Sequence, residues 1–283
     1  MKKGIIIMLL LALGGSVAGA KEKKDDMAER LEIAYYALID SASACIDRGE
    51  WAAAEQFTQK AINLKPDDET SAMLLCNLAT IQRYERRYDE ALANYNRALK
   101  ISPNSAQMLH NRARLYTEAG MIDEAKGDYD SILARDSLDI EALYNRGMLR
   151  VNTDDFDAAR ADFDRINAIE PGSKYATEGM AMINKANGNY QEAIDLYSLL
   201  ISKQPTAILL SQRADCYMRI EQYNEASADI NDAISLDPDD PYLYLVRGKL
   251  GHLRFSREDV HRDYDMAVKL GIDPETAKKA ITE

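Results

Sequence analysis

The residues that could make charged contacts at regular intervals are arginines and aspartates. In four segments an Arg is followed sixteen residues later by an Asp: Arg112 and Asp128, Arg146 and Asp162, Arg213 and Asp229, and Arg247 and Asp263. A guanidinium can donate parallel hydrogen bonds to a carboxylate, so this spacing is typical of ion pairs between packed helices. The alternative is an arginine ladder for an anionic ligand, which is less favoured because each Arg has its own carboxylate.

The ion-pair hypothesis makes a prediction about stability. Asp162→Ala should lower the stability far more than the same change at an exposed aspartate such as Asp139, because Asp162 is expected to be paired and Asp139 is not.

Other residue types that carry chemistry are scarce. The three histidines lie in different predicted helices, and the sequence has no H-E-x-x-H, paired C-x-x-C, phosphate-binding glycine loop or G-x-S-x-G phrase. The cysteines Cys45, Cys76 and Cys216 fall within apolar helical patterns and are expected to be small buried hydrophobes. Cys45 with Cys76 is the one pair to test for a disulfide. We therefore expect no cofactor, no metal site and no enzymatic activity.

The composition narrows the class of partner. The chain has 35 Lys plus Arg against 47 Asp plus Glu, a formal net charge of −12. An acidic surface repels phosphate, so nucleic acid is not expected as a partner. A hydrophobic share of 46% supports a packed core.

The first twenty residues have the three parts of a bacterial secretory signal peptide. Lys2 and Lys3 precede an apolar run over 5–13, and a small-x-small tripeptide ends at Ala20, after which cleavage is expected. The apolar run is too short to span a bilayer, which takes about 20 residues. The mature chain is predicted to be exported to the periplasm or beyond, without a membrane span. Residues 21–34 form a charged lead segment, either disordered or an extension of the first helix.

One phrase recurs along the mature chain with a period close to 34. Its last residues are Ala54, Ala91, Ala125, Ala159, Ala193, Ala226 and Val260. Seven units follow, beginning near 35, 72, 106, 140, 174, 207 and 241 and ending at 272. Position 8 of each unit is small, position 20 is almost always Ala, position 24 is mostly aromatic and position 32 is often Pro.

These positions describe a helical hairpin. Apolar residues at 20, 24 and 27 follow a helix face, small residues at 8 and 20 allow close approach of two helices, and Pro at 32 ends the second helix. Such a unit cannot bury its apolar face alone and must stack on its neighbours. Residues 273–283 are predicted to form a short capping helix, with Asp273 as N-cap and Pro274 at its first position.

The pattern resembles the tetratricopeptide repeat family, which has small residues at 8, 20 and 27, aromatics at 11, 17 and 24, and Pro at 32. The resemblance covers 35–272, although the family's Trp at position 4 is absent. It implies an all-α, right-handed solenoid of about seven hairpins with a concave face lined by first helices.

The resemblance also implies where a partner binds, because concave-face contacts in that family come from positions 2, 5, 9 and 12. The predicted partner-binding residues are Tyr36, Met73, His110, Arg114, Tyr144, Met148, Tyr175, Met182 and Tyr242. The alternative is that some of them only pack between neighbouring first helices.

The predicted function is a non-enzymatic scaffold that binds a peptide or protein segment in its concave groove, in the bacterial envelope. The alternatives are an accessory subunit of a cell-wall or polysaccharide-processing complex and a self-assembling structural protein, which would make the chain a homo-oligomer.

Overall fold

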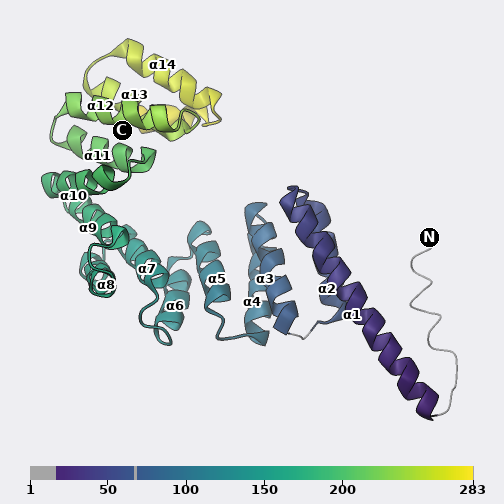
Figure 1. Ribbon diagram of the computed structural model, residues 1–283. Coiled ribbons are helices and arrows are strands. Elements are labelled where there is room, and N and C mark those ends of the chain that lie inside the picture. Colours follow the sequence, from purple (N-terminus) through teal and green to yellow (C-terminus); the bar gives the residue numbers. More distant parts are fainter. Residues whose placement is uncertain (1–16, 67–68, 283) are drawn as a thin grey trace. The chain divides into compact units, whose positions relative to one another are not determined.

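The computed structural model describes residues 17–66 and 69–282, with side chains from residue 27 onward. Residues 1–16 of the predicted signal peptide lie outside this part. Every regular element in the described ranges is a helix (Figure 1). In chain order they are α1 (Val17–Asp47), α2 (Trp51–Leu64), α3 (Glu69–Tyr84), α4 (Tyr88–Ile101), α5 (Ala106–Glu118), α6 (Ile122–Leu133), α7 (Ile140–Asn152), α8 (Phe156–Ile169), α9 (Lys174–Ala186), α10 (Tyr190–Lys203), α11 (Ala207–Arg219), α12 (Tyr223–Leu236), α13 (Pro241–Leu253), α14 (Arg257–Lys269) and α15 (Pro274–Thr282).

The chain divides into two compact units, the first ending at Asp128 and the second beginning at Tyr129, within α6. In the first unit α1 packs on α2 and α3 on α4, while α2 contacts α3 and α4 contacts α5. In the second unit every helix from α7 to α14 packs on the next one along the chain. The expected all-helical architecture of consecutively packed pairs is confirmed. Within the described ranges, no helix combines the length and the apolar character needed to cross a bilayer.

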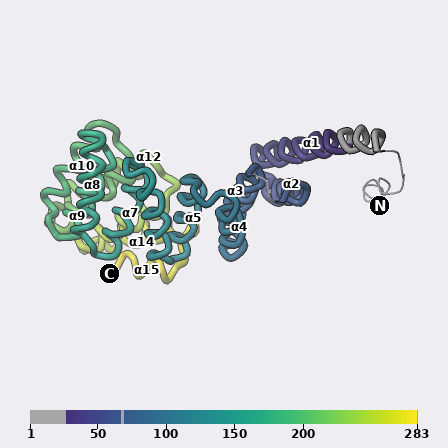
Figure 2. Tube along the Cα trace, turned by 90° about the horizontal axis from the view of Figure 1, so that it is seen from below, coloured from purple at the N-terminus to yellow at the C-terminus, as the bar shows by residue number. Residues whose placement is uncertain are grey.

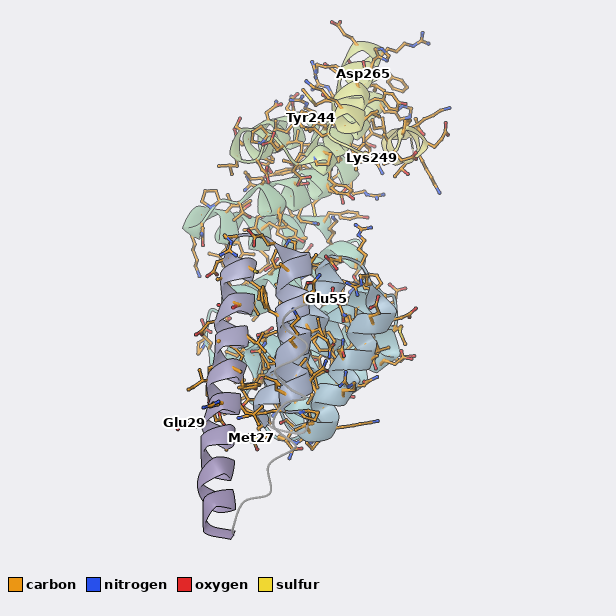
Figure 3. The ribbon with its side chains drawn as sticks, turned by 90° about the vertical axis from the view of Figure 1, so that its right-hand side faces the viewer. Met27, Glu29, Glu55, Tyr244, Lys249 and Asp265 are labelled. Atoms are coloured by element: carbon orange, nitrogen blue, oxygen red, sulfur yellow. The ribbon has the colours of Figure 1, made fainter. Side chains whose placement is uncertain are left out.

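The lead segment belongs to the first helix. α1 is 31 residues long against 14 for α2, so it runs on beyond its partner (Figure 2). Met27 and Glu29, labelled in Figure 3, are exposed on α1. Further along, the first and second repeats are joined by Glu55, whose carboxylate accepts hydrogen bonds from Arg87 at 2.6 and 3.0 Å.

The repeated positions form the core. The Ala residues at position 20 have no exposed surface in six repeats, and the aromatic side chains at position 24 of the second to fifth repeats are buried beside them. Those core residues are Ala54, Ala91, Ala125, Ala159, Ala193, Ala226, Tyr95, Tyr129, Phe163 and Tyr197. Small and aromatic residues therefore alternate at the helix contacts, which gives dense packing.

The turn inside each hairpin uses one backbone conformation. Position 15 has a positive φ in all seven repeats: Gly49, Arg86, Gly120, Asp154, Gly188, Glu221 and Phe255. Glycine adopts this left-handed conformation without strain, whereas a side chain makes it costly. The turn is therefore strained in the four repeats that have a side chain at position 15, and unstrained in the three that have glycine.

Side-chain caps begin several first helices. Asp139 Oδ1 accepts a hydrogen bond from the Ala142 amide at 2.8 Å, and Asp273 Oδ2 accepts one from the Thr276 amide at 2.9 Å. Asp139 was expected to be exposed and unpaired. It is instead half-buried and forms the N-cap of α7, so it is not a suitable control for Asp162→Ala. The cap arises because Asp favours the position just before a helix.

Candidate functional site

The first helices of neighbouring repeats share one face in each unit. α3 contacts α5 in the first unit, and α7 contacts α9 and α11 contacts α13 in the second. Among the described residues no comparable contact joins the second helices α8, α10, α12 and α14 to one another. Because the first helices approach each other more closely, they form the inner side of the stack within each unit. We call the exposed and half-buried residues of this side the first-helix face.

The predicted partner-binding residues differ in exposure. Tyr36, Met73, Arg114, Tyr175 and Tyr242 are exposed. Tyr144, Met148 and Met182 are half-buried, and His110 is buried.

His110 is only 6% exposed and offers little surface to a partner, so its predicted role in binding is not supported by its position. The physical reason is the close packing of α5 on α3. Asn111 beside it donates a hydrogen bond to the Cys76 sulfur at 3.3 Å, which joins the two helices at this level.

Two of the predicted residues, Tyr144 and Tyr175, and two of their neighbours gather on α7 and α9 of the fourth and fifth repeats. The rings of Tyr144 and Tyr175 lie 5.1 Å apart between centroids, tilted by 56°. The Tyr144 hydroxyl and the Glu178 carboxylate interact electrostatically. The Lys174 ammonium lies 5.0 Å from the centroid of the Tyr175 ring. We call Tyr144, Tyr175, Glu178 and Lys174 the tyrosine–glutamate cluster.

The buried Phe163 explains why α7 and α9 come so close. A Cβ at Gly147 of α7 would lie 2.7 Å from the Phe163 ring, and one at Gly179 of α9 would lie 2.4 Å from it. Only glycine fits at either place, so the ring of α8 sits directly against both backbones. The Tyr144 ring also lies 6.3 Å from that of Phe163. The cluster thus rests on a rigid base.

Burial sets the electrostatics of the cluster. Desolvation raises the pKa of Glu178, and the interactions with Tyr144 and Lys174 only partly offset this. Desolvation together with the Glu178 charge raises the pKa of Tyr144. The cluster therefore offers an aromatic surface and a partly desolvated carboxylate. That carboxylate can accept a hydrogen bond from a partner.

The arginine–aspartate pairs are built alike in four repeats. Each Arg donates two parallel hydrogen bonds, through Nε and Nη2, to the Asp on the second helix of its own repeat. Arg112 reaches Asp128 at 2.8 and 2.6 Å, and Arg213 reaches Asp229 at 2.8 and 2.7 Å. The same bonds join Arg146 to Asp162 and Arg247 to Asp263. The hydrogen bonds to the aspartates raise the pKa of Arg112 and of Arg213.

Each arginine also forms a third hydrogen bond, which was not predicted from the sequence. Nη1 donates to position 25 of the preceding repeat, on its second helix: Asn96 Oδ1 at 2.6 Å, Asp130 Oδ1 at 2.5 Å, Ser198 Oγ at 2.8 Å and Asn231 Oδ1 at 3.0 Å. Each Arg thus joins its own hairpin to the preceding one. A small polar residue at position 25 before each Arg is the signal that could have revealed this.

Metal-ligand residue types and cysteines are dispersed or buried in the part of the chain with described side chains. No group of three or more His, Cys, Asp or Glu residues there is placed to hold a metal ion. Cys45, Cys76 and Cys216 are free and buried. Burial raises the pKa of Cys76, and raises that of Cys216 to about 11. Such thiols stay protonated near neutral pH and are weak nucleophiles.

The family models that match this chain all describe the same kind of repeat. Four family models described as tetratricopeptide repeat match residues 34–104, 83–149, 144–208 and 208–240. A crystal structure of a tetratricopeptide repeat protein from Parabacteroides merdae ATCC 43184 is 33% identical and has a TM-score of 0.79, covering 88% of this chain and 97% of that one.

More remote similarities share the fold alone. The Pseudomonas aeruginosa pilF structure is 19% identical with a TM-score of 0.58, over 74% of this chain and 95% of that one. The mouse RNA polymerase II-associated protein 3 is 30% identical over 105 residues, which are 37% of this chain and 14% of that protein. The chain spans only between 10% and 14% of the length of such relatives.

Proposed function

Because the chain belongs to the tetratricopeptide repeat family, we propose that it is a non-enzymatic scaffold that holds a peptide or protein segment on its first-helix face. The family supplies the class of activity, protein–protein interaction. The tyrosine–glutamate cluster is the observation that carries the choice of site.

The cluster has the properties of a recognition surface. Tyr175 is 37% exposed, and its ring lies beside that of Tyr144, which in turn lies near the buried Phe163 ring. A rigid tyrosine provides contact area at a low entropic cost, and flexible Met148 and Met182 follow at position 9 of the same two repeats. The partner segment that fits places apolar side chains on the rings and a donor group, an amide or an amine, on Glu178.

Affinity capture tests this proposal. The full chain is immobilised and exposed to an envelope extract of its own bacterium, and bound proteins are identified by mass spectrometry. We expect at least one saturable partner whose capture falls about tenfold in Tyr175→Ser. The matched control is Leu199→Ser, which removes an exposed apolar side chain from the second helix α10. Equal capture by both variants would reject the first-helix face as the site.

We further propose that the protein acts in the bacterial envelope, after export. The basic start, the short apolar run and Ala18-Gly19-Ala20 support this. Cell fractionation followed by N-terminal sequencing should find a chain beginning at Lys21 outside the cytoplasm. A cytoplasmic chain that keeps residues 1–20 would refute export.

A further inference from the structure

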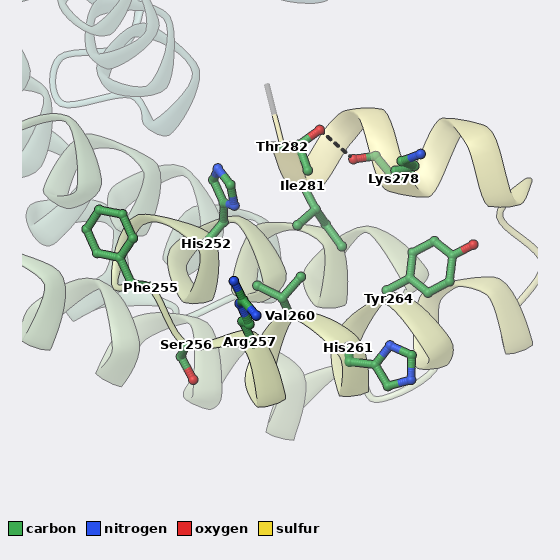
Figure 4. A pocket seen from close by; sticks show the side chains of 10 residues that line it. All are labelled: His252, Phe255, Ser256, Arg257, Val260, His261, Tyr264, Lys278, Ile281 and Thr282. Atoms are coloured by element: carbon green, nitrogen blue, oxygen red, sulfur yellow. Dashed lines mark hydrogen bonds between the residues drawn. The ribbon is translucent and has the colours of Figure 1, made fainter.

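A cavity of about 470 Å³ opens beside the last repeat, between α14 and α15. Its floor is apolar, formed by Val260 of α14 and Ile281 of α15, which point toward each other in Figure 4. Ile281 is buried, and a Cβ at Gly248 would lie 2.8 Å from its Cδ1, so α15 is packed tightly on α13. The volume falls within the range of about 300–1,000 Å³ that is usual for ligand sites.

Phe255, at one end of the cavity, is both strained and exposed (Figure 4). Its φ is 59° and its exposed fraction is 94%, so no packing inside the chain offsets the left-handed conformation. Arg86, Asp154 and Glu221 share this turn position and its positive φ, and Gly49, Gly120 and Gly188 fill it in the other repeats. Phe255 is the one apolar side chain among the seven, and its exposure places an aromatic surface at the edge of the cavity.

The rim of the cavity is positively charged although the chain is acidic. Arg257 and Lys278 line it together with His252 and His261, and none of the lining residues is a carboxylate. Among the described residues neither Arg257 nor Lys278 forms an ion pair. His261 faces Asp265 at 3.5 Å, but both side chains are well exposed and Asp265 lies outside the lining. The net charge of the whole chain is −12, so this rim differs from the rest of the molecule.

We propose that this cavity is a second binding site, which takes a short acidic peptide segment of a partner protein with an apolar side chain between its carboxylates. The apolar side chain packs on Phe255, Val260 and Ile281, and the flanking carboxylates pair with Arg257 and Lys278. Charge complementarity selects an acidic occupant over a basic one. The site goes beyond the proposed function, because it lies on α14 and α15 and uses none of the tyrosine–glutamate cluster.

Fluorescence polarisation tests the charge requirement. The probe is the fluorescein-labelled peptide Glu-Asp-Phe-Leu-Asp-Glu, titrated with the full chain at an ionic strength of about 0.05 M. We expect saturable binding that weakens at least about tenfold in the double variant Arg257→Ala, Lys278→Ala. The control double variant Lys249→Ala, Lys269→Ala removes the same charge from α13 and α14 outside the cavity and should bind like the wild type.

Three results would overturn the proposal: no saturable binding of this peptide, the same loss in both double variants, or equal affinity for Lys-Lys-Phe-Leu-Lys-Lys or Glu-Asp-Ser-Ser-Asp-Glu. Tyr175→Ser should leave the peptide affinity unchanged. The two sites therefore fail or succeed separately.

Phe255→Gly separates a binding role from a structural one. Glycine accepts the turn conformation, so the melting temperature should stay the same or rise, while the affinity for the acidic peptide should fall at least about fivefold. A variant that binds the peptide as well as the wild type would remove Phe255 from the site.

Discussion

The fifth and sixth repeats stack on each other yet fill the same two positions with opposite chemistry. Position 7 and position 23 are Arg213 and Asp229 in the sixth repeat, joined by two hydrogen bonds. In the fifth repeat they are Met180 and Leu196, which cannot form an ion pair. Leu196 packs on the apolar cluster of its own hairpin instead. In both repeats the two helices nevertheless pack on each other as a hairpin, α9 on α10 and α11 on α12.

The difference shows which residues define the hairpin. The small residue at position 8 and the Ala at position 20 are buried in both repeats: Ala181, Ala193, Ala214 and Ala226. The apolar register is therefore sufficient for the hairpin, and the ion pair is one of two ways to fill an adjoining site. A buried ion pair and an apolar pair of similar volume often give similar stability, whereas half of an ion pair does not.

The largest effect is expected for Asp162→Ala. Asp162 accepts hydrogen bonds from Arg146 and also from Arg150 at 2.6 Å, so its loss leaves two partly buried guanidinium groups without their shared carboxylate. We expect a loss of about 3–5 kcal/mol in the free energy of unfolding. Urea denaturation followed by circular dichroism measures it. Asp164→Ala, an exposed position on the same helix, should change it by less than about 0.5 kcal/mol. Equal losses would contradict the pairing.

The second prediction concerns replacing the ion pair of the sixth repeat by the apolar pair of the fifth. Asp229→Ala alone should cost about 3 kcal/mol, because Arg213 is left unpaired. The double change Arg213→Met, Asp229→Leu should return to within about 1 kcal/mol of the wild type, since it reproduces the pair found in the fifth repeat. The same denaturation experiment applies. A double variant as unstable as the single one would mean that the two repeats are not interchangeable.

A smaller effect is expected at the junction of these repeats. Ser198 Oγ accepts a hydrogen bond from Arg213 at 2.8 Å, so Ser198→Ala should cost about 1 kcal/mol. In Arg213→Met the same serine change should cost much less, because the donor is already gone. Comparing the two backgrounds by thermal denaturation measures the coupling, and equal costs would show that the bond contributes nothing.

The smallest effect concerns Glu178. Burial raises its pKa in the folded chain, so the unfolded chain ionises first as the pH rises, and stability is lost through that range. Glu178→Gln should therefore raise the melting temperature slightly at pH 7, and the gain should shrink as the pH falls below about 4, where the carboxyl becomes protonated in both states. A gain independent of pH would contradict the raised pKa.

The structure could be predicted from the sequence wherever one residue type recurs at the same position of successive repeats. Ala193 at position 20 and Tyr197 at position 24 repeat along the chain, so the helix faces, and with them the family and the all-helical fold, could be predicted. The correlated positions of Arg213 and Asp229 likewise predicted which side chains meet, because Arg at position 7 and Asp at position 23 occur together in the same four repeats.

Other features depend on contacts that no single repeat encodes. Position 25 varies between Asn, Asp and Ser, so its hydrogen bond to the next arginine does not stand out. His110 is buried because α5 packs on α3, whereas Tyr144, which holds the same position in the next repeat, is half-buried. The cavity beside Phe255 arises from α15, which lies outside the repeat pattern.

Recognition on the first-helix face is best tested by site-specific photocrosslinking. A benzophenone amino acid replaces Tyr175 in one full-length variant and Leu199 in another, and each is irradiated in living cells. We expect a discrete crosslinked partner from position 175 and none from position 199. The same partner captured from position 199, with none from position 175, would contradict it.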